Sequence, residues 1–562
     1  MSSVSAFVLD NPGLCALALC GVGAVWIYNK RASKLPNIPG PRSSSFLTGN
    51  LFDLVAPTTG RDWVINTSNT YGGATKLSTL FGGRSLMIND QKALHHLLVK
   101  EQDNFEEWEA WTTTNDLLFG PGLLSTAGAQ HKKQRRMLTP AFSVKNLRGM
   151  TPMFVSIARE LEGAISAMVE KGPKEIDLTA WLSRVALEAI GRGGMGVSFG
   201  KMSEPTTFST ATKQLAAILS ALLPIGTLTP FFKYLGPGEF RRFMIKFLPF
   251  PLLKSLEVIV NIMEDEGKKM LRAQDATLAA EDDSSETKNI IGILLKANQT
   301  SIDSERMSDE ELIAQTSTLI FTAMDTTSSA ISRVLHQLAI HPEAQEKLRA
   351  EISEAYHNQD DAIDFNNLMA LPYMDAVIKE TLRVFPPLPV AFRQTLKDTV
   401  LPLLHPITGE DGTILNEVLV EKGTDVFVNV IGANHNPKTW GDDAGEWKPE
   451  RWLSELPESV TKIRDYSGVF AHQMTFMAGN RSCIGFNFAL LEMSEYLFFE
   501  LLPDILNLRA GVVLALFLQS FEFSLPKDKD IVWNLGLLMI PVIKGATSLE
   551  SQLPLVVKKR GT

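Results

Sequence analysis

Apolar residues recur three and four positions apart along most of the chain, which is the pattern of helices with one buried face. Long examples lie at 154–171, 309–341 and 367–385. The alternation typical of strands is short and rare, and its clearest case is 74–90. An acidic, aperiodic stretch at 274–288 predicts a surface loop between helices. The chain is therefore predicted to be mainly α with small β-sheets, in the α+β class.

An apolar segment near the N-terminus breaks this pattern. Residues 12–28 carry no charge and end with Trp26 and Tyr28, ahead of a basic cluster at 30–34. Such a run is near the short end of what spans about 30 Å of hydrocarbon, with aromatic residues at the interface and basic residues on the cytoplasmic side. A cleaved signal peptide is the alternative, but its positive charge precedes the apolar run. We expect one transmembrane helix, with 1–11 on the luminal side.

The composition of the chain is that of an ordinary globular protein. The chain has 562 residues, of which 45% are hydrophobic and 21% charged. Prolines make 29–45 a stiff basic linker, and 46–562 is predicted to be one large catalytic domain. The formal net charge of −9 disfavours a nucleic-acid partner. An aromatic segment at 223–253 fits either core packing or contact with a bilayer and an apolar substrate.

The cysteines exclude a disulfide framework, because two of the three lie in the apolar N-terminal run and only Cys483 belongs to the body. Cys483 precedes a helical pattern, where unpaired amides favour a thiolate. Gly479 and Gly485 permit close backbone approach or positive φ, Phe476 could shield the sulfur, and Arg481 supplies a cation. A thiolate beside an arginine suits an iron porphyrin, whose metal binds sulfur and whose propionates bind the cation. The alternative is an ordinary free cysteine at a helix start.

The stretch "FMAGNRSCIG" carries this spacing, and it resembles the haem-binding loop F-x-x-G-x-R-x-C-x-G of the cytochrome P-450 superfamily, the haem-thiolate monooxygenases. The resemblance implies the cytochrome P-450 fold and haem b (iron protoporphyrin IX) as cofactor. It makes Cys483 the axial ligand of the haem iron. It also places four residues of the loop at the cofactor: Phe476, Gly479, Arg481 and Gly485.

Further motifs extend the resemblance over nearly the whole body. "KETLR" supplies the E-x-x-R pair Glu380 and Arg383, and "KPERW" supplies Arg451. In the family these residues form a charge network behind the haem loop, which implies a structural role. Without the resemblance, Glu380 and Arg383 would be an ordinary salt bridge along one helix face.

Three more residues match positions that contact the haem propionates in the family. His131 and Arg135 stand in the W-x-x-x-R pattern, with histidine in place of tryptophan, and Arg393 follows in "VAFRQT". The resemblance therefore implies a propionate cage of His131, Arg135, Arg393 and Arg481. Taken singly, such basic residues are more often solvated charges.

"FTAMDTTSSA" resembles the oxygen-activation motif of the family's central helix. Asp325 and Thr326 take the acid and alcohol positions, which implies proton delivery while dioxygen is cleaved. A threonine bonding back to a helix carbonyl is the alternative for Thr326. Ala323 replaces the usual glycine and is expected to narrow the oxygen groove. Candidates for the substrate pocket are Ala323, Met324, Val390, Trp108, Trp111 and Phe119.

The chain departs from the family after the haem loop. Similar chains run from "FALLEM" directly into a helix like "VVLALFLQSFEF", whereas here 494–510 intervenes. Pro503 should break a helix at this point, and the segment is strongly apolar. Our hypothesis is that 494–510 translates a retained intron or a misplaced splice boundary. The alternative is a genuine insertion that bulges to the surface.

The resemblance is to fungal microsomal members of the family. It implies a monooxygenase of the endoplasmic reticulum membrane with a cytoplasmic catalytic domain and an apolar small-molecule substrate, such as a terpenoid, steroid, fatty acid or xenobiotic. Electrons should come from NADPH through a separate cytochrome P-450 reductase, with cytochrome b5 as a further partner. A haem-thiolate isomerase or dehydratase, and an inactive haem-binding protein, are the alternative functions.

Overall fold

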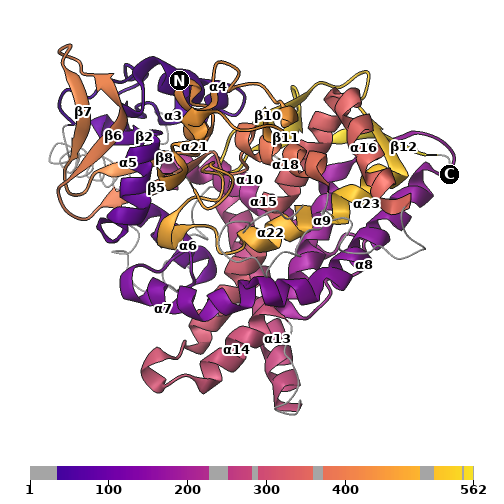
Figure 1. The fold of residues 1–562 in the computed structure, drawn as a ribbon. Helices are drawn as coiled ribbons and strands as arrows, with labels where there is room; N and C mark the ends of the chain where they lie inside the picture. Colours follow the sequence, from indigo (N-terminus) through magenta and orange to yellow (C-terminus); the bar gives the residue numbers. More distant parts are fainter. Residues whose placement is uncertain are drawn as a thin grey trace, which may run out of the picture.

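The computed structural model describes residues 35–226, 229, 251–280, 289–357, 371–466, 468–493, 512–546 and 550–560. Helices make up most of these ranges, and small sheets flank the helical body (Figure 1). The predicted anchor at 12–28 lies outside them. Within the ranges given, no helix combines the length and apolar character that a membrane crossing needs.

The central element is α15 (Asp309–Ile340), a helix of 32 residues. Its start is fixed by a capping box: the Ser308 hydroxyl accepts from the Glu311 amide at 3.2 Å, and the Glu311 carboxylate accepts from the Ser308 amide at 3.0 Å. Much of α15 is buried, because other helices surround it. Its neighbours include α6 (Glu109–Phe119), α9 (Leu178–Ala189), α13 (Pro251–Ala280), α18 (Pro372–Val384) and α22 (Phe486–Met493).

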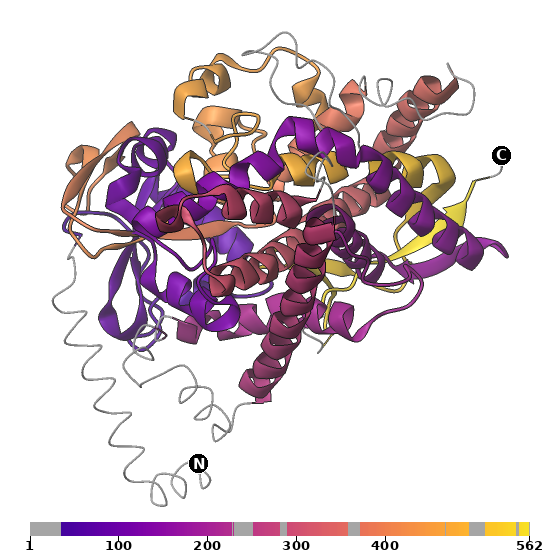
Figure 2. The same ribbon diagram turned by 90° about the horizontal axis from the view of Figure 1, so that it is seen from below.

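The other helices complete the body. In the view from below, α13 lies in front of it (Figure 2). The remaining α-helices of the described ranges are α3 (Leu51–Leu54), α4 (Gly60–Tyr71), α5 (Gln91–His95), α7 (Gly128–Leu138), α8 (Val144–Val169), α10 (Thr207–Gly226), α14 (Ile290–Thr300), α16 (Pro342–His357), α19 (Val430–Asn434), α20 (Pro437–Trp440), α21 (Glu458–Thr461) and α23 (Val512–Ser520).

The largest sheet has the strand order β1 (Ala74–Ser78), β2 (Arg84–Ile88), β8 (Asp425–Asn429), β5 (Val390–Thr395) and β3 (Phe105–Glu107). Strand β3 is antiparallel to β5, and this register places Glu107 opposite Arg393 and Glu106 opposite Gln394. The smaller sheets are formed by β4 (Lys174–Asp177) with β12 (Pro554–Lys559) and β9 (Phe521–Ser524), β6 (Thr399–Thr408) with β7 (Ile414–Val420), and β10 (Ile531–Asn534) with β11 (Ile540–Ile543).

The predicted loop at 274–288 is wrong over its first part, because α13 continues to Ala280. Gln274 is buried and Leu278 packs against the main core, so the buried face of the helix extends into this polar stretch. Residues 281–288 lie outside the described ranges. The same holds for 230–250, the centre of the aromatic segment, so its two interpretations stay open.

The segment 494–511 also lies outside the described residues, and its origin therefore stays a prediction. The helices on either side of it, α22 and α23, contact each other and both pack on α8. They are neighbours in Figure 1. The two helices that the sequence analysis expects to be joined directly are thus adjacent in space.

Candidate haem-thiolate site

Cys483 lies in a loop between a short 3-10 turn, η10 (Gly479–Arg481), and α22. Its backbone amide donates to the Phe476 carbonyl at 3.0 Å, which closes the loop. The Phe476 ring is buried between Phe470 and Phe486, with ring centroids 5.5 and 6.1 Å away. Cys483 itself is exposed. The Cys483 amide and the buried Phe476 ring therefore hold the loop in place, while the Cys483 sulfur remains accessible.

The pKa of this thiol is set by opposing effects. Although Cys483 is exposed, the surrounding protein desolvates it, and this desolvation raises the pKa of the thiol. The Gly485 amide and the Arg135 guanidinium act in the opposite direction without prevailing. The amide effect predicted from the sequence is present at Gly485, but the opposing effect of desolvation, which the sequence did not reveal, is larger. A metal cation at the sulfur would deprotonate it outright.

The two glycines of the loop have different roles. Gly479 has φ +69°, and a Cβ there would lie 1.8 Å from the Leu98 carbonyl oxygen, so only glycine fits. Gly485 has no positive φ, and a Cβ there would meet the Phe142 ring at an ordinary 3.8 Å. Its contribution is the amide that points at the Cys483 sulfur.

The predicted propionate residues gather beside this loop. Arg135 of α7 donates to the Ser482 carbonyl at 2.8 Å and to the Ser482 hydroxyl at 3.1 Å. His131 is buried one turn earlier on the same helix. Burial, together with the charges of Arg481, Arg135 and Arg393, lowers the pKa of His131 to about 3. His131 is therefore a neutral imidazole at physiological pH.

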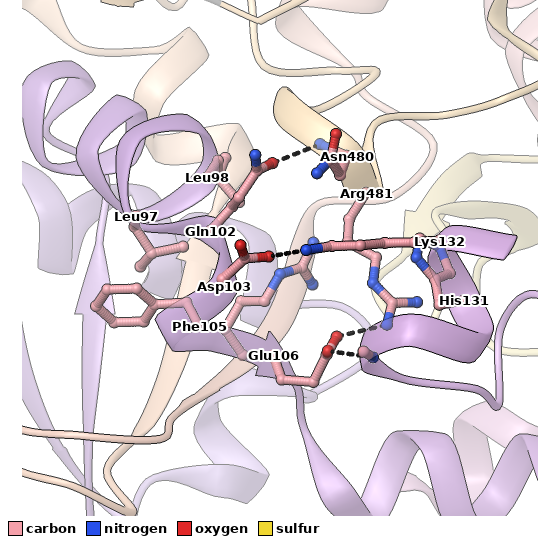
Figure 3. Close-up of a pocket in the computed structure, with 12 residues that line it drawn as sticks. Leu97, Leu98, Gln102, Asp103, Phe105, Glu106, His131, Lys132, Asn480 and Arg481 are labelled. Atoms are coloured by element: carbon pink, nitrogen blue, oxygen red, sulfur yellow. Dashed lines mark hydrogen bonds and ion pairs between the residues drawn. The ribbon is translucent and has the colours of Figure 1, made fainter. Parts of the chain in front are cut away.

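Two of these arginines have acidic partners that the sequence analysis missed. Arg481 forms an ion pair with Glu106 and donates to the Thr126 carbonyl at 2.9 Å. Arg393 forms an ion pair of 2.8 Å with Glu107. Figure 3 shows Glu106, Arg481 and His131 converging on one pocket. The only sign of them in the sequence is that Glu106 and Glu107 are adjacent. No spacing pattern connects these two residues with the haem loop, which lies far away along the chain.

This donor set fits an iron porphyrin. The accessible sulfur of Cys483 suits a soft metal position, and the close approach at Gly479 holds the loop in one shape. Three guanidiniums, those of Arg135, Arg393 and Arg481, suit the two propionates. Cys483 would hold the iron, and these side chains with His131 would hold the propionates.

The charge network of the E-x-x-R motif lies behind the loop, and its central pair, Glu380 with Arg383, is fully buried. Arg383 donates to both Glu380 carboxylate oxygens, at 2.8 and 2.9 Å, and neither side chain is exposed. Arg451 donates from Nε to Glu380 at 3.4 Å, and its Nη2 lies 2.8 Å from Asp443. The Trp452 indole donates to the same Glu380 carboxylate at 2.9 Å.

Contacts to the backbone join this network to the Cys483 loop. Arg383 also donates to the carbonyls of Asn434 and Ala444, at 2.8 and 2.6 Å. On the same helix, the Leu382 carbonyl accepts from the Thr475 hydroxyl at 2.9 Å, directly before Phe476. With every charge paired, the network is a rigid support for the loop.

The acid and alcohol of α15 have distinct environments. The Thr326 hydroxyl donates to the Thr322 carbonyl at 2.7 Å, which is the back-bonded arrangement. Asp325 has a buried Oδ2 that has no hydrogen-bond partner among the described residues. Burial raises the pKa of Asp325 to about 7, and the Lys213 ammonium opposes this rise. Asp325 lines a small cavity of mixed character, whose polar lining residues include Lys213, Thr179, Ser328, Ser329 and Ser332.

The predicted substrate residues do not form one group. Ala323 is half-buried, but Met324 is 1% exposed within the main core, so the expectation that it faces a pocket is wrong. Val390 is buried in a separate cluster near the sheet. The Trp108 ring lies 5.3 Å from that of Phe392 on β5, and Trp111 packs near the same ring. Phe119 packs on Phe321 of α15, with ring centroids 5.0 Å apart.

Comparisons with known proteins agree with this geometry. The cytochrome P450 family model matches residues 39–502. Cytochrome P450 monooxygenase 81 of Postia placenta is 40% identical over 96% of this chain and 97% of its own length. Ganoderic acid synthetase CYP5150L8 of Ganoderma lucidum is 38% identical over 97% of this chain and 99% of its own. The chain therefore belongs to the cytochrome P450 family of haem-thiolate monooxygenases.

Proposed function

We propose that this P450 monooxygenase inserts one oxygen atom of O2 into an apolar organic substrate, using haem b and electrons that NADPH supplies through a separate reductase. The observation that carries the proposal is the accessible Cys483 sulfur beside three guanidiniums. When bound, haem b supplies the activation of dioxygen. Cytochrome b5 is proposed as a second electron donor.

The residues of the chain have separable tasks in this proposal. Cys483 would hold the iron, and its thiolate would supply electron density that favours cleavage of the O–O bond. His131, Arg135, Arg393 and Arg481 orient the propionates. The network of Glu380 keeps the loop in position, because a buried pair with all its hydrogen bonds satisfied tolerates little displacement.

Asp325 and Thr326 are proposed to deliver protons. A carboxyl group with a pKa of about 7 both takes up and releases a proton near neutral pH. The cavity beside Asp325 is lined by hydroxyl groups and Lys213, which suits water molecules that resupply the proton. Because the Thr326 hydroxyl donates to Thr322, the lone pairs of its oxygen remain available to accept a hydrogen bond.

The location follows from the sequence alone. Residues 12–28 are proposed to anchor the protein in the endoplasmic reticulum membrane, with 46–562 on the cytoplasmic side. An apolar substrate that concentrates in the bilayer would then be close to the enzyme. The name of the Ganoderma relative refers to ganoderic acid synthesis, and among apolar substrates we place those of ganoderic acid synthesis first on that basis.

An inactive haem-binding protein is the second candidate function. The observation that favours it is Glu492, whose buried carboxylate next to 494–511 has no hydrogen-bond partner in the described ranges. Sequencing the transcript tests the origin of 494–510. A spliced transcript without this segment supports the intron hypothesis, and a mature transcript that encodes it contradicts that hypothesis.

The function is tested by turnover of the full-length protein with a P450 reductase, NADPH and a panel of apolar substrates. We expect NADPH consumption in step with a product that is heavier by one oxygen atom, and no product from the Cys483→Ser variant. A rearranged or dehydrated product formed without NADPH would instead identify an isomerase or dehydratase. Haem uptake without any product would identify the inactive form.

A further inference from the structure

We propose that Glu106 is a positioning residue of the haem cage, which holds Arg481 and the start of α7 together and places a negative charge beside the propionates. The inference rests on the proposed function, since it concerns how the chain receives the haem. No motif of the sequence contains Glu106, and it lies far from the Cys483 loop along the chain.

The geometry shows one carboxylate joining three elements. One oxygen of Glu106 pairs with Arg481 of the haem loop and accepts the Glu107 amide of its own strand at 3.1 Å. The other oxygen accepts the Gly128 amide at 2.9 Å, and Gly128 is the first residue of α7. Figure 3 shows Glu106 joined to Arg481 within the pocket. Glu106 thereby fixes the haem loop relative to the helix that carries His131 and Arg135.

The charge of Glu106 is maintained by the same contacts. Burial by itself would raise the pKa of Glu106, but the Arg481 guanidinium and the amides of Gly128 and Glu107 lower it below its ordinary value. The carboxylate is therefore ionised at neutral pH. The side chains of Glu106 and Arg481 are 24% and 13% exposed, so solvent screens the pair only in part.

Arg481 retains capacity for a second anion. Its Nη2 bonds Glu106 and the Thr126 carbonyl, and Nη1 makes a long contact of 3.4 Å to the Leu123 carbonyl. Its Nε has no hydrogen-bond partner in the part of the chain that the structure describes. A propionate and Glu106 would therefore share one guanidinium, and each anion would weaken the hold of Arg481 on the other.

Two substitutions of Glu106 separate the effect of its anchoring hydrogen bonds from the effect of its negative charge. Glu106→Gln keeps an oxygen for the Gly128 amide but removes the negative charge, so Arg481 attracts the propionate more strongly. Removing a negative charge near the haem also raises the reduction potential, because the reduced iron carries less positive charge. Glu106→Ala removes both anchors, so Arg481 and α7 lose their fixed relation and the haem is held less tightly.

The test measures haem loss to apomyoglobin and the haem reduction potential in the full-length holoprotein. We expect haem loss about threefold slower and a higher potential for Glu106→Gln, and haem loss about tenfold faster for Glu106→Ala. Asp103→Asn is the matched control, because Asp103 pairs with Lys132 at 2.6 Å on the exposed rim of the same pocket. Its haem loss should stay within about twofold of wild type.

Equal acceleration in both Glu106 variants would contradict the charge role and overturn the proposal. An unchanged potential and unchanged haem loss in Glu106→Gln would also overturn it, even if Glu106→Ala does not fold. These outcomes require a wild-type protein with a thiolate-bound haem spectrum. If wild type lacks that spectrum, the proposed function fails first.

Discussion

Glu380 and Glu492 are buried glutamates on the two helices next to the Cys483 loop, with 0% and 1% of their side-chain surfaces exposed. Glu380 accepts from two arginines, the Trp452 indole and the Lys448 amide. Neither carboxylate oxygen of Glu492 has a hydrogen-bond partner in the described ranges, and burial raises the pKa of Glu492 to about 8.

The difference shows that burial alone does not reveal what an acidic residue does. Each carboxylate oxygen of Glu380 accepts hydrogen bonds, so this side chain links its own helix, α18, to the segment that contains Lys448, Arg451 and Trp452. Glu492 would be protonated at neutral pH, and it lies one residue before the end of α22, where the chain enters 494–511. Glu380 has all its partners, whereas Glu492 has none among the described residues and lies next to the segment 494–511.

Glu380→Ala should have the largest effect. It leaves Arg383 buried without its acid, and losing one member of a buried pair costs about 3–5 kcal/mol. We expect this decrease in the free energy of unfolding by chemical denaturation, together with lower haem content. A loss below about 1 kcal/mol, the size of an exposed pair, would mean that the network does not support the loop.

Asp325 sharpens the comparison, because its Oδ2 also has no hydrogen-bond partner among the described residues but the side chain lines a cavity with hydroxyl groups and Lys213. Asp325→Asn should slow turnover about 100-fold, the usual contribution of a general acid, with little change in stability. As a proton donor with a pKa of about 7, Asp325 is active below that value, so wild-type turnover should fall as pH rises through it. The variant should lack this decline.

The matched control for that prediction is Glu492→Gln, which alters a second buried acid, on α22. Its turnover should equal that of wild type at each pH. Equal pH profiles of wild type and Asp325→Asn would exclude Asp325 as the proton donor.

Glu492→Gln should have the smallest effect, and one that depends on pH. The folded pKa of about 8 lies above the ordinary 4.5, so the stability that wild type has at low pH is lost as pH rises towards 8. Between pH 6 and 7.5 wild type should lose about 2 kcal/mol relative to the variant. Parallel unfolding curves at both pH values would mean that Glu492 has a partner.

The sequence predicted the parts of this site that short motifs carry. The Cys483 loop, the pair Glu380 and Arg383, and the grouping of Arg135 with Arg481 were all implied by the resemblance of these motifs to the family. The acids Glu106 and Glu107 could not be predicted, because the register of β3 against β5 brings them to the cage.

Other differences arise from packing. The Met324 side chain packs into the core because neighbouring elements cover its face of α15. The motif alone does not show which face of the helix they cover. The pKa of Cys483 depends on the balance between desolvation and a few nearby charges. A helix start in the sequence reveals the amides that lower the pKa, but not the desolvation that raises it.

The central claim, that Cys483 holds haem iron as a thiolate, is tested most directly by the carbon monoxide difference spectrum of the reduced full-length protein. The account predicts a Soret band at about 450 nm that is absent in Cys483→Ser. A band near about 420 nm in wild type, or no haem uptake, would contradict it.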